Sequence, residues 1–199
     1  MRAFIAIDLP ASAQRSLERL QDELRKAQAD VKWVESSQLH LTVKFLGEIT
    51  DAQRQAVEGL LRALALEEPP FSMALGRLGA FASLSAPGVI WVSVTEGAER
   101  AKRLAERIEA SSQALGLRQD ARAFAAHVTL GRVRTPRNRA QLSRALQDTA
   151  WQAPTPWRVD AVRLYQSLLH SVGPRYQALS DVALQGAGSN PGPSARPAP

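Results

Sequence analysis

Two short segments that lie far apart in the chain repeat one pattern, and this repetition restricts the fold more than any other feature. Residues 39–47 read LHLTVKFLG and residues 126–133 read AHVTLGRV, so each contains His-x-Thr followed by an aliphatic residue. Both are rich in aliphatic and β-branched residues, which is typical of β-strands. Two of the three histidines in the chain lie in this pattern. A single His-x-Thr would carry no weight, but two in matching strands indicate a duplicated unit.

The spacing within each motif predicts where the polar side chains point. Side chains alternate between the two faces of a strand, so residues two apart share a face. His40 and Thr42 therefore lie side by side on one strand, and His127 and Thr129 on the other. The residues between them point the other way, towards a core. We expect the two strands to face each other across a groove between two lobes.

Helical and extended patterns alternate along the rest of the chain. Apolar residues at helical spacing predict four helices. Three of them span residues 11–29, 97–115 and 136–148. The remaining helix begins at a capping box of Thr50 and Gln53 and ends at Pro69. Extended patterns predict strands at 2–9, 31–34, 71–81, 89–94, 157–169 and 176–184, besides the two His-Thr strands at 39–47 and 122–133. This order favours an α+β fold, a doubled unit with helices on the outside of two sheets.

Composition limits the class of protein. With 199 residues, of which 45% are hydrophobic, the chain can bury a real core, and we expect one bilobal domain over residues 1–184. Residues 185–199 are mostly Gly, Pro, Ser and Ala and are predicted to be a disordered tail. There is no cysteine, which excludes disulfides and thiolate chemistry. The chain opens on a predicted strand rather than a signal segment, and no apolar run reaches the ~20 residues that span a bilayer, so we expect a cytoplasmic protein without a membrane partner.

The formal net charge is +6. A basic balance suits a polyanionic partner such as nucleic acid, but abundant arginine also accompanies biased genome composition, so charge alone leaves this open.

Two imidazoles in one groove are suited to general acid and general base catalysis, because their usual pKa lies near neutral pH. Threonine hydroxyls can donate hydrogen bonds to anionic oxygens. Together these groups suit a phosphodiester, with one histidine activating the attacking oxygen and the other protonating the leaving oxygen. A metal site would need more converging His, Asp or Glu, and a serine triad would need a Gly-x-Ser-x-Gly elbow, which is absent. We therefore predict no metal and no cofactor.

Other residues near the motifs allow more than one interpretation. Strict alternation places Arg132 opposite His127, although Gly131 could turn the strand and bring the guanidinium to a phosphate. Lys44 shares the His40 face and could reach a phosphate. Phe45 could stack on a base, as aromatic side chains do in proteins that bind single strands, but alternation assigns it to the core unless a bulge intervenes. His170 lacks a threonine partner and is predicted to be structural or on the surface. Further arginines form either a basic rim for RNA or a solvated face: Arg134, Arg137, Arg139 and Arg144.

Both motifs and their flanks resemble the 2H phosphoesterases, and within them the RNA 2′,3′-cyclic phosphodiesterases once called 2′-5′ RNA ligases. The matching segments cover residues 1 to about 184: RAFIAIDLP at 2–10, Trp33-Val34, HLTVKFLG at 40–47, FAAHVTLGR at 124–132, LYQS at 164–167, Gly173 and Tyr176. The sequence departs from the family pattern at Ala126, where proline is usual, and at Gly131, where alanine is common.

The resemblance implies two lobes related by a pseudo-twofold axis, each an antiparallel sheet with helices on the outside, with a central cleft between them. It also implies metal-independent hydrolysis of RNA 2′,3′-cyclic phosphate ends to 2′-phosphate, and 2′-5′ RNA joining as the reverse reaction. By this analogy His40 protonates the departing 3′ oxygen and His127 activates water. Thr42, Thr129 and Arg132 hold the phosphate, and Phe45 lies near the nucleobase.

The implied partner is RNA with cyclic phosphate ends, tRNA fragments among the candidates, and the implied state is a monomer. Two alternatives stay open at this stage. One is a protein that binds RNA ends without turnover, and the other is a 2H hydrolase of small cyclic-phosphate nucleotides.

Overall fold

A computed structural model describes residues 1–170 and 173–187, although not the side chains of residues 169, 170, 173 and 174. In this part of the chain the helices are α1 (Ala11–Arg25), α2 (Asp51–Glu67), α3 (Ala98–Ser112) and α4 (Arg139–Asp148), with one 3₁₀ turn, η1 (Ser36–Gln38). The strands are β1 (Arg2–Asp8), β2 (Val31–Trp33), β3 (His40–Glu48), β4 (Phe71–Met73), β5 (Leu75–Ala82), β6 (Pro87–Val94), β7 (His127–Val133), β8 (Trp157–Val159), β9 (Ala161–His170) and β10 (Gly173–Ala183).

Most strands join in one antiparallel sheet with the order β10-β9-β1-β3-β7-β6-β5, and β2 pairs with the edge of β7. The sheet has two halves that meet where β3 pairs with β7, and among the described residues Leu41 and Val128 are the single pair that joins these two strands. Both of these residues are fully buried. The strands of the two halves therefore touch at the centre of the two His-x-Thr motifs and diverge on either side. β4 and β8 form a separate two-stranded sheet.

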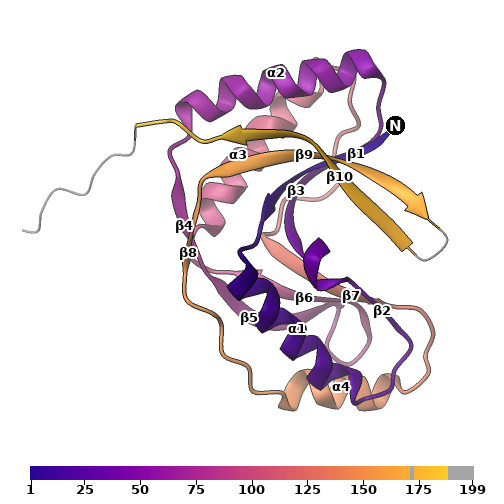
Figure 1. The fold of residues 1–199 in the computed structure, drawn as a ribbon. Helices are drawn as coiled ribbons and strands as arrows, with labels where there is room; N and C mark the ends of the chain where they lie inside the picture. The colour runs from indigo at the N-terminus through magenta and orange to yellow at the C-terminus, as the bar shows by residue number, and fades with distance from the viewer. Residues whose placement is uncertain (171–172, 188–199) are drawn as a thin grey trace, which may run out of the picture.

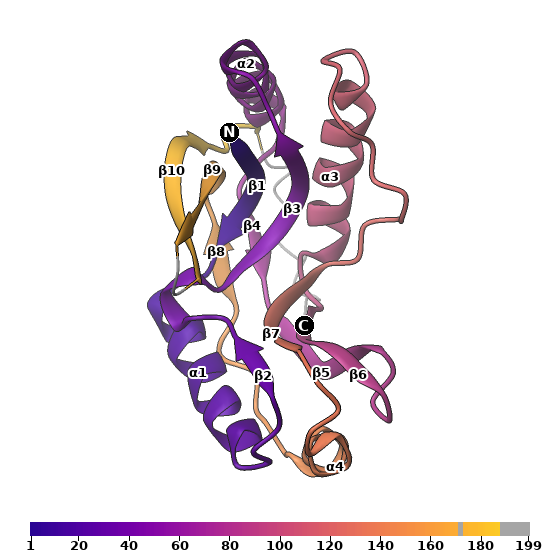
Figure 2. The same cartoon turned by 90° about the vertical axis from the view of Figure 1, so that its right-hand side faces the viewer.

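Helices cover the two halves of the sheet on the outside (Figures 1 and 2). α2 and α3 pack against each other, α3 packs on β3 and α2 packs on β10, whereas α1 and α4 pack together beside β2 and β7. Each lobe thus takes one helix from each half of the chain, because α1 crosses from β1 to the lobe of β7 and α3 crosses from β6 to the lobe of β3. The α+β class with two lobes and external helices, predicted from the sequence, is confirmed.

A β-bulge follows each His-x-Thr motif at the same position. In the pairing of β1 with β3, Ile5 faces Lys44 and Ala6 faces Thr42, so Val43 is the extra residue. In the pairing of β6 with β7, Ile90 faces Gly131 and Trp91 faces Thr129, so Leu130 is the extra residue. Because a bulge places two successive side chains on one face, it reverses the alternation for the residues directly after it.

The predicted helices and strands occur in the predicted order, and the capping box of Thr50 and Gln53 is present. Several boundaries were wrong. α1 ends at Arg25 rather than at residue 29, α3 ends at Ser112 rather than at 115, and α4 begins at Arg139 rather than at 136. The strand predicted at 157–169 is two strands, β8 and β9, which belong to different sheets.

Residues 122–126 were predicted to begin the second His-Thr strand, but β7 begins at His127. In the preceding segment the carbonyl oxygen of Ala126 still accepts from the backbone N–H of Val94 on β6 at 3.0 Å, but residues 122–125 are not in a strand. Further back, side chains from β3 and α3 hold Arg118 and Asp120.

The end of the described chain packs against α2. Gln185 and Gly186 donate backbone hydrogen bonds to the carbonyl oxygens of Ala65 and Glu68. The disordered tail predicted at 185–199 therefore does not begin at residue 185. Residues 188–199 lie outside the described residues, so their disorder stays a prediction.

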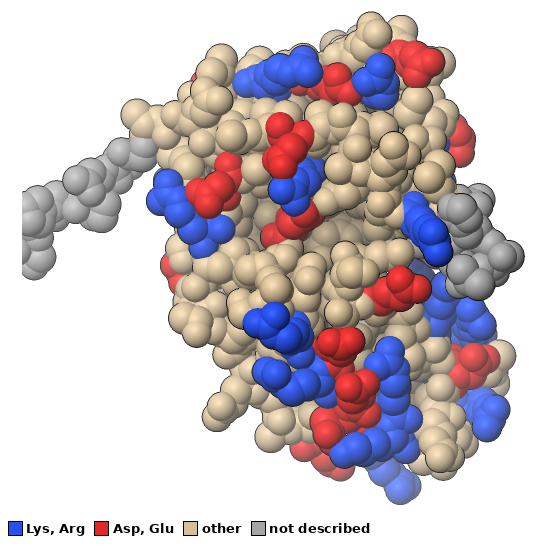
Figure 3. All heavy atoms as spheres, in the orientation of Figure 1, with Lys and Arg blue, Asp and Glu red and all other residues tan. Residues whose placement is uncertain are grey.

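Charged side chains of both signs are spread over the surface in Figure 3. Basic side chains gather along its lower right edge, where Figure 1 shows the segment that leads from β7 to α4. No helix within the described part of the chain is both long and apolar enough to cross a bilayer.

Candidate active site

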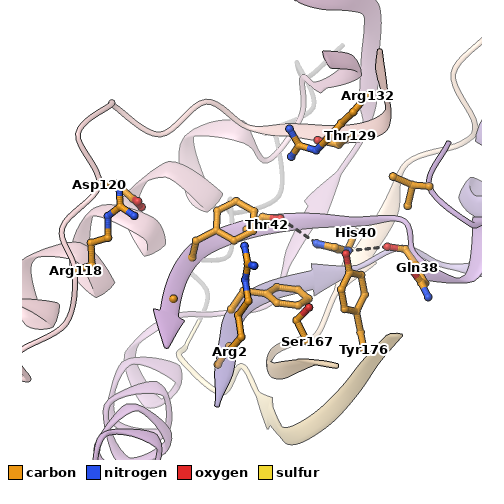
Figure 4. A pocket seen from close by; sticks show the side chains of 15 residues that line it. Arg2, Gln38, His40, Thr42, Arg118, Asp120, Thr129, Arg132, Ser167 and Tyr176 are labelled. Carbon is orange, nitrogen blue, oxygen red and sulfur yellow. Dashed lines mark hydrogen bonds between the residues drawn. The ribbon is translucent and has the colours of Figure 1, made fainter. Parts of the chain in front are cut away.

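A cleft of about 570 Å³ opens on the face of the sheet where β3 and β7 meet (Figure 4). Several strands and the segment between α3 and β7 contribute to it. The polar and aromatic residues that line it are Arg2, Phe4, Gln38, His40, Thr42, Phe45, Arg118, Asp120, Thr129, Arg132, Ser167 and Tyr176. Figure 4 shows Thr129 and Arg132 on one wall, facing the wall that carries His40 and Tyr176. Every predicted site residue except His127 therefore lines this cleft.

His40 is held in one tautomer by the 3₁₀ turn that precedes its strand. Its Nδ1 lies 2.7 Å from the carbonyl oxygen of Gln38, and a carbonyl can only accept, so Nδ1 carries a proton. Its Nε2 lies 2.9 Å from Oγ1 of Thr42. The ring stacks on Phe4 at 4.9 Å and meets Tyr176 edge-on at 5.4 Å. Burial lowers the pKa of His40 below its usual 6.5, although the hydrogen bond to Gln38 raises it.

His127 repeats this arrangement on the other strand. Its Nδ1 lies 2.6 Å from the carbonyl oxygen of Ala125, again two residues before the histidine, so Nε2 is left as the basic nitrogen of the neutral ring. Its ring contacts Phe81 at 5.2 Å and Trp91 at 6.3 Å. Burial lowers the pKa of His127, the hydrogen bond to Ala125 raises it, and the charge of Arg132 lowers it further.

The register of the sheet relates the two motifs. Leu41 pairs with Val128 in antiparallel orientation, so the same register continued by one residue sets His40 opposite Thr129 and Thr42 opposite His127. All four side chains lie on the face away from the buried pair. The pseudo-twofold relation between the lobes thus passes through Leu41 and Val128, and it places each histidine across from the threonine of the other motif.

Arg132 links the two halves of this face. Its charge lowers the pKa of His127 and also opposes the rise that burial causes in the pKa of Tyr176. Tyr176 in turn contacts the ring of His40. The charge of Arg2, which also lines the cleft, lowers the pKa of Tyr176 in the same way. This position favours the interpretation that Arg132 binds a phosphate.

The bulges decide which flanking residues reach the cleft. Because of the bulge at Leu130, Gly131 is buried and Arg132 is exposed on the cleft side, where strict alternation had placed it on the opposite face. The equivalent bulge at Val43 exposes 55% of Phe45 and places it in the cleft lining. The alternation argument that put Phe45 in the core was therefore wrong, because two successive buried residues precede it.

The same bulge turns Lys44 away from the cleft, so its predicted reach to a phosphate was wrong as well. Lys44 is only 2% exposed and forms an ion pair with Glu109 of α3. Its Nζ also donates to the carbonyl oxygen of Arg118 at 3.0 Å and lies 3.7 Å from a carboxylate oxygen of Asp120. This buried cation holds the segment between α3 and β7 so that Arg118 and Asp120 line the end of the cleft (Figure 4).

A second cavity of about 510 Å³ lies behind His40. It shares His40, Gln38 and Tyr176 with the cleft. Asp8, which also lines it, accepts hydrogen bonds from the Tyr165 hydroxyl at 2.8 and 2.9 Å and pairs with Arg163.

Within residues 1–170 and 173–187, no three His, Cys, Asp or Glu side chains gather to hold a metal ion. The side chain of His170 lies outside the described part of the chain.

Sequence reasoning missed several residues of the cleft. Arg2, Ser167 and Tyr176 lie within segments that carry the family resemblance. The sequence therefore marked these segments, but it did not indicate that the three side chains line the site. Arg118 and Asp120 carry no pattern of their own, and only the contacts of Lys44 bring them to the site.

The LigT like phosphoesterase family model matches the chain twice, over residues 7–91 and again over 92–176. The chain belongs to this family. The predicted resemblance to the 2H phosphoesterases is thereby confirmed, and the two matches correspond to the two His-x-Thr motifs.

Relatives of this LigT-like phosphoesterase resemble it over nearly its full length. The RNA 2′,3′-cyclic phosphodiesterase of Methanothermobacter thermautotrophicus is 32% identical over 176 residues, which cover 88% of this chain and 95% of the relative. The protein of the same name from Archaeoglobus fulgidus is 32% identical over 179 residues, 90% of this chain and 98% of the relative.

Solved structures of LigT-like proteins show the same fold. TT0787 of Thermus thermophilus has a TM-score of 0.78 and 28% identity, with 94% of this chain and 100% of that chain covered. E. coli LigT complexed with 3′-AMP has a TM-score of 0.74 and 25% identity, with 92% and 97% covered.

Proposed function

We propose that the chain hydrolyses 2′,3′-cyclic phosphate ends of RNA to 2′-phosphates, with His40 and His127 as the acid and base and without a metal. The observation that carries this proposal is the antiparallel Leu41–Val128 pair, because it sets the two His-x-Thr motifs against each other on one face beside the cleft. The names of the relatives, RNA 2′,3′-cyclic phosphodiesterase, support the choice of substrate.

His127 is the general base. Burial and the nearby charge of Arg132 both lower the pKa of this imidazole, which keeps it neutral at the pH where it must accept a proton. Its Nδ1–H donates to the carbonyl oxygen of Ala125, so Nε2 offers its lone pair to the attacking water. As water attacks phosphorus, its proton passes to this Nε2.

His40 is the general acid. Its Nε2 lies beside the Thr42 hydroxyl, which donates to it in the neutral ring and accepts from it in the protonated ring. Burial lowers the pKa of free His40, but a bound phosphate anion favours the imidazolium form. The protonated Nε2 then delivers its proton to the ribose O3′ as the P–O3′ bond breaks, which leaves the phosphate on O2′.

The phosphate and the terminal nucleoside are held by the remaining lining residues. Arg132 can present a guanidinium fork to two non-bridging oxygens, and the hydroxyls of Thr42 and Thr129 supply further donors. Phe45 is more than half exposed in the same cleft and offers a flat face to the terminal base.

The test is product analysis in excess EDTA with an RNA oligonucleotide that ends in a 2′,3′-cyclic phosphate. The wild-type protein is expected to yield only the 2′-phosphate. His40→Ala and His127→Ala should each lower kcat by at least about 10²-fold while circular dichroism shows an unchanged fold. A 3′-phosphate product, a need for added metal, or full activity in either variant would contradict the proposal.

The same assay separates the alternatives. A protein that only binds RNA ends would retain the oligonucleotide without turnover. A hydrolase of small nucleotides would show a higher kcat/KM on 2′,3′-cyclic mononucleotides than on oligonucleotides. Comparison of tRNA fragments with unrelated oligonucleotides of equal length would show whether tRNA ends are preferred.

A further inference from the structure

Two aromatic side chains are exposed in the described part of the chain, and the ring of one of them, Phe81, contacts a histidine of the paired motifs. Phe45 follows His40 on β3 and is 55% exposed in the cleft. Phe81, near the end of β5, is 41% exposed, and its ring meets the ring of His127 at right angles at 5.2 Å. Trp91 of β6 supports Phe81 from another side, with the ring centres 5.1 Å apart. Exposed aromatic side chains are costly, so Phe81 beside the His127 imidazole indicates a site for a flat ligand, in addition to the site at Phe45 in the cleft.

The direction of phosphoryl transfer distinguishes these two sites. The attacking and leaving oxygens lie roughly in line on opposite sides of phosphorus. In the proposed reaction the leaving O3′ belongs to the terminal ribose and faces His40, so that ribose and its base lie on the side of β3, where Phe45 is. The RNA upstream is joined to the same ribose and leaves from that side as well. The group beside His127 must therefore be the attacking group.

An attacking water molecule gains nothing from an aromatic surface beside His127, whereas the base of an attacking nucleoside can stack on it. We propose that Phe81, backed by Trp91, forms an acceptor subsite for the first base of an RNA 5′ end, whose 5′-hydroxyl replaces water as the attacking group. This inference rests on the proposed function. It names the second substrate of the joining reaction, in which RNA ends are linked through a 2′-5′ bond, and the residue that binds it.

The step balances without a further reactant. The 5′ oxygen forms a bond to phosphorus and its proton passes to Nε2 of His127, while the P–O3′ bond breaks and His40 protonates O3′. The cyclic phosphate supplies the driving strain, and the product is a 2′-5′ phosphodiester. Stacking on an aromatic face accepts any base, so the acceptor subsite should show little sequence preference.

The experiment measures how a labelled oligonucleotide with a 2′,3′-cyclic phosphate end partitions between hydrolysis and joining, in the presence of a second oligonucleotide with a 5′-hydroxyl. The ratio of joined to hydrolysed product is compared between wild type and Phe81→Leu. Leucine keeps an apolar contact with His127 but removes the flat face. The ratio should fall at least about fivefold, in line with the loss of one base stack. Phe81→Tyr should keep the wild-type ratio.

Because both products need the same two histidines, a general disturbance of the site would lower both and leave the ratio unchanged. Phe45→Leu serves as the internal comparison and should lower both products alike. Leu66→Ala, on α2 and 63% exposed, is the control for loss of an exposed apolar side chain and should change neither product.

The outcomes are distinguishable. If the wild type does not open the cyclic phosphate at all, the proposed function fails and the acceptor subsite fails with it. If the wild type hydrolyses the end but never joins a saturating 5′-hydroxyl oligonucleotide, or if Phe81→Leu keeps the wild-type ratio, the acceptor subsite is wrong while the hydrolase proposal stands.

Discussion

Arg132 has two roles that differ in what they require of the side chain. The guanidinium fork positions the phosphate, whereas the positive charge alone lowers the pKa of His127. A lysine at this position would keep the charge and lose the fork, and a glutamine would lose both. The two substitutions therefore separate phosphate binding from control of the base.

The pH dependence of kcat/KM tests this assignment. The pKa values of both histidines lie below 6.5, so the base becomes protonated, and activity falls, on the acid side of that pH. In Arg132→Gln the pKa of His127 should rise, because a cation that opposed its protonation is gone. The acid limb of the kcat/KM profile should then move to higher pH, whereas in Arg132→Lys it should stay near the wild-type position.

A lower kcat/KM is expected in both variants at every pH, because both lose the fork. An acid limb that does not move in Arg132→Gln would show that Arg132 does not act on the base. Equal shifts in both variants would show that the fork, rather than the charge, sets the pKa of His127.

The close packing of β2 against β7 limits which side chain fits at position 131. Gly131 faces Trp33 of β2, and a Cβ atom built on it would lie 2.7 Å from Cγ1 of Val31 and 3.0 Å from Cε3 of Trp33. Gly131→Ala should therefore lower the free energy of unfolding by about 1–3 kcal/mol, because β2 must move away from β7. Urea denaturation measures this change.

Gly59 offers a matched control within α2. A Cβ atom there meets no other atom within 4 Å, and alanine favours a helix interior over glycine. Gly59→Ala should raise the free energy of unfolding by about 0.5–1 kcal/mol. If both alanine variants change stability in the same direction, packing of β2 against Gly131 is not what the structure indicates.

At the scale of elements, the segment between α3 and β7 depends on one buried ion pair. Lys44 reaches it from β3 through Glu109 and the carbonyl of Arg118, and Glu109 also accepts from the backbone N–H of Asp120 at 3.0 Å. Desolvation is the largest influence on the pKa of Glu109 and raises it, but the hydrogen bonds from Lys44 and Asp120 prevail, so the pKa is lowered overall. The wall of the cleft is thus tied to the strand that carries His40.

Removal of the lysine charge should be costly. Lys44→Met leaves Glu109 without its partner and should reduce the free energy of unfolding by on the order of 3 kcal/mol in urea denaturation. Adding Glu109→Gln removes the unpaired charge, so the double variant should lose less than the sum of the two single variants. Additive losses would mean that the pair contributes no coupling energy to this wall.

At the scale of the whole molecule, the net charge of +6 is unevenly compensated. The segment that follows Arg132 carries three exposed arginines, Arg134, Arg137 and Arg139, and within residues 1–170 and 173–187 none of them forms an ion pair with an acidic side chain. Exposed Arg158, by contrast, pairs with Asp160 at 2.6 Å. Unpaired cations on the segment that follows Arg132 can contact phosphates of a bound RNA chain.

The matched comparison uses glutamine at paired and unpaired positions. The double variant Arg134→Gln/Arg137→Gln should raise KM for a long oligonucleotide and reduce the slope of log KM against log salt by about 0.7 for each phosphate that is no longer neutralised. KM for a 2′,3′-cyclic mononucleotide should not change, and Arg158→Gln should leave both substrates unaffected. A parallel rise with the mononucleotide would assign these arginines to the reacting phosphate rather than to the RNA chain.

Local pattern by itself determined much of this protein. Apolar periodicity placed the four helices, and the capping residues Thr50 and Gln53 marked where α2 begins, because these signals depend on neighbours in the sequence. The two His-x-Thr motifs determined that an imidazole and a hydroxyl share a face in each half, since a strand alternates whatever lies beside it.

Only the tertiary structure decided which flanking side chains join them. A bulge arises from the register between two strands, so nothing in residues 40–45 predicts the one at Val43, and Gly131 indicated only that the second strand could turn. The bulges at Val43 and Leu130 bring Phe45 and Arg132 into the cleft and send Lys44 inward to Glu109. The meeting of Phe81 with His127 likewise depends on β5, β6 and β7 lying side by side, which is a contact between distant segments that no local pattern encodes.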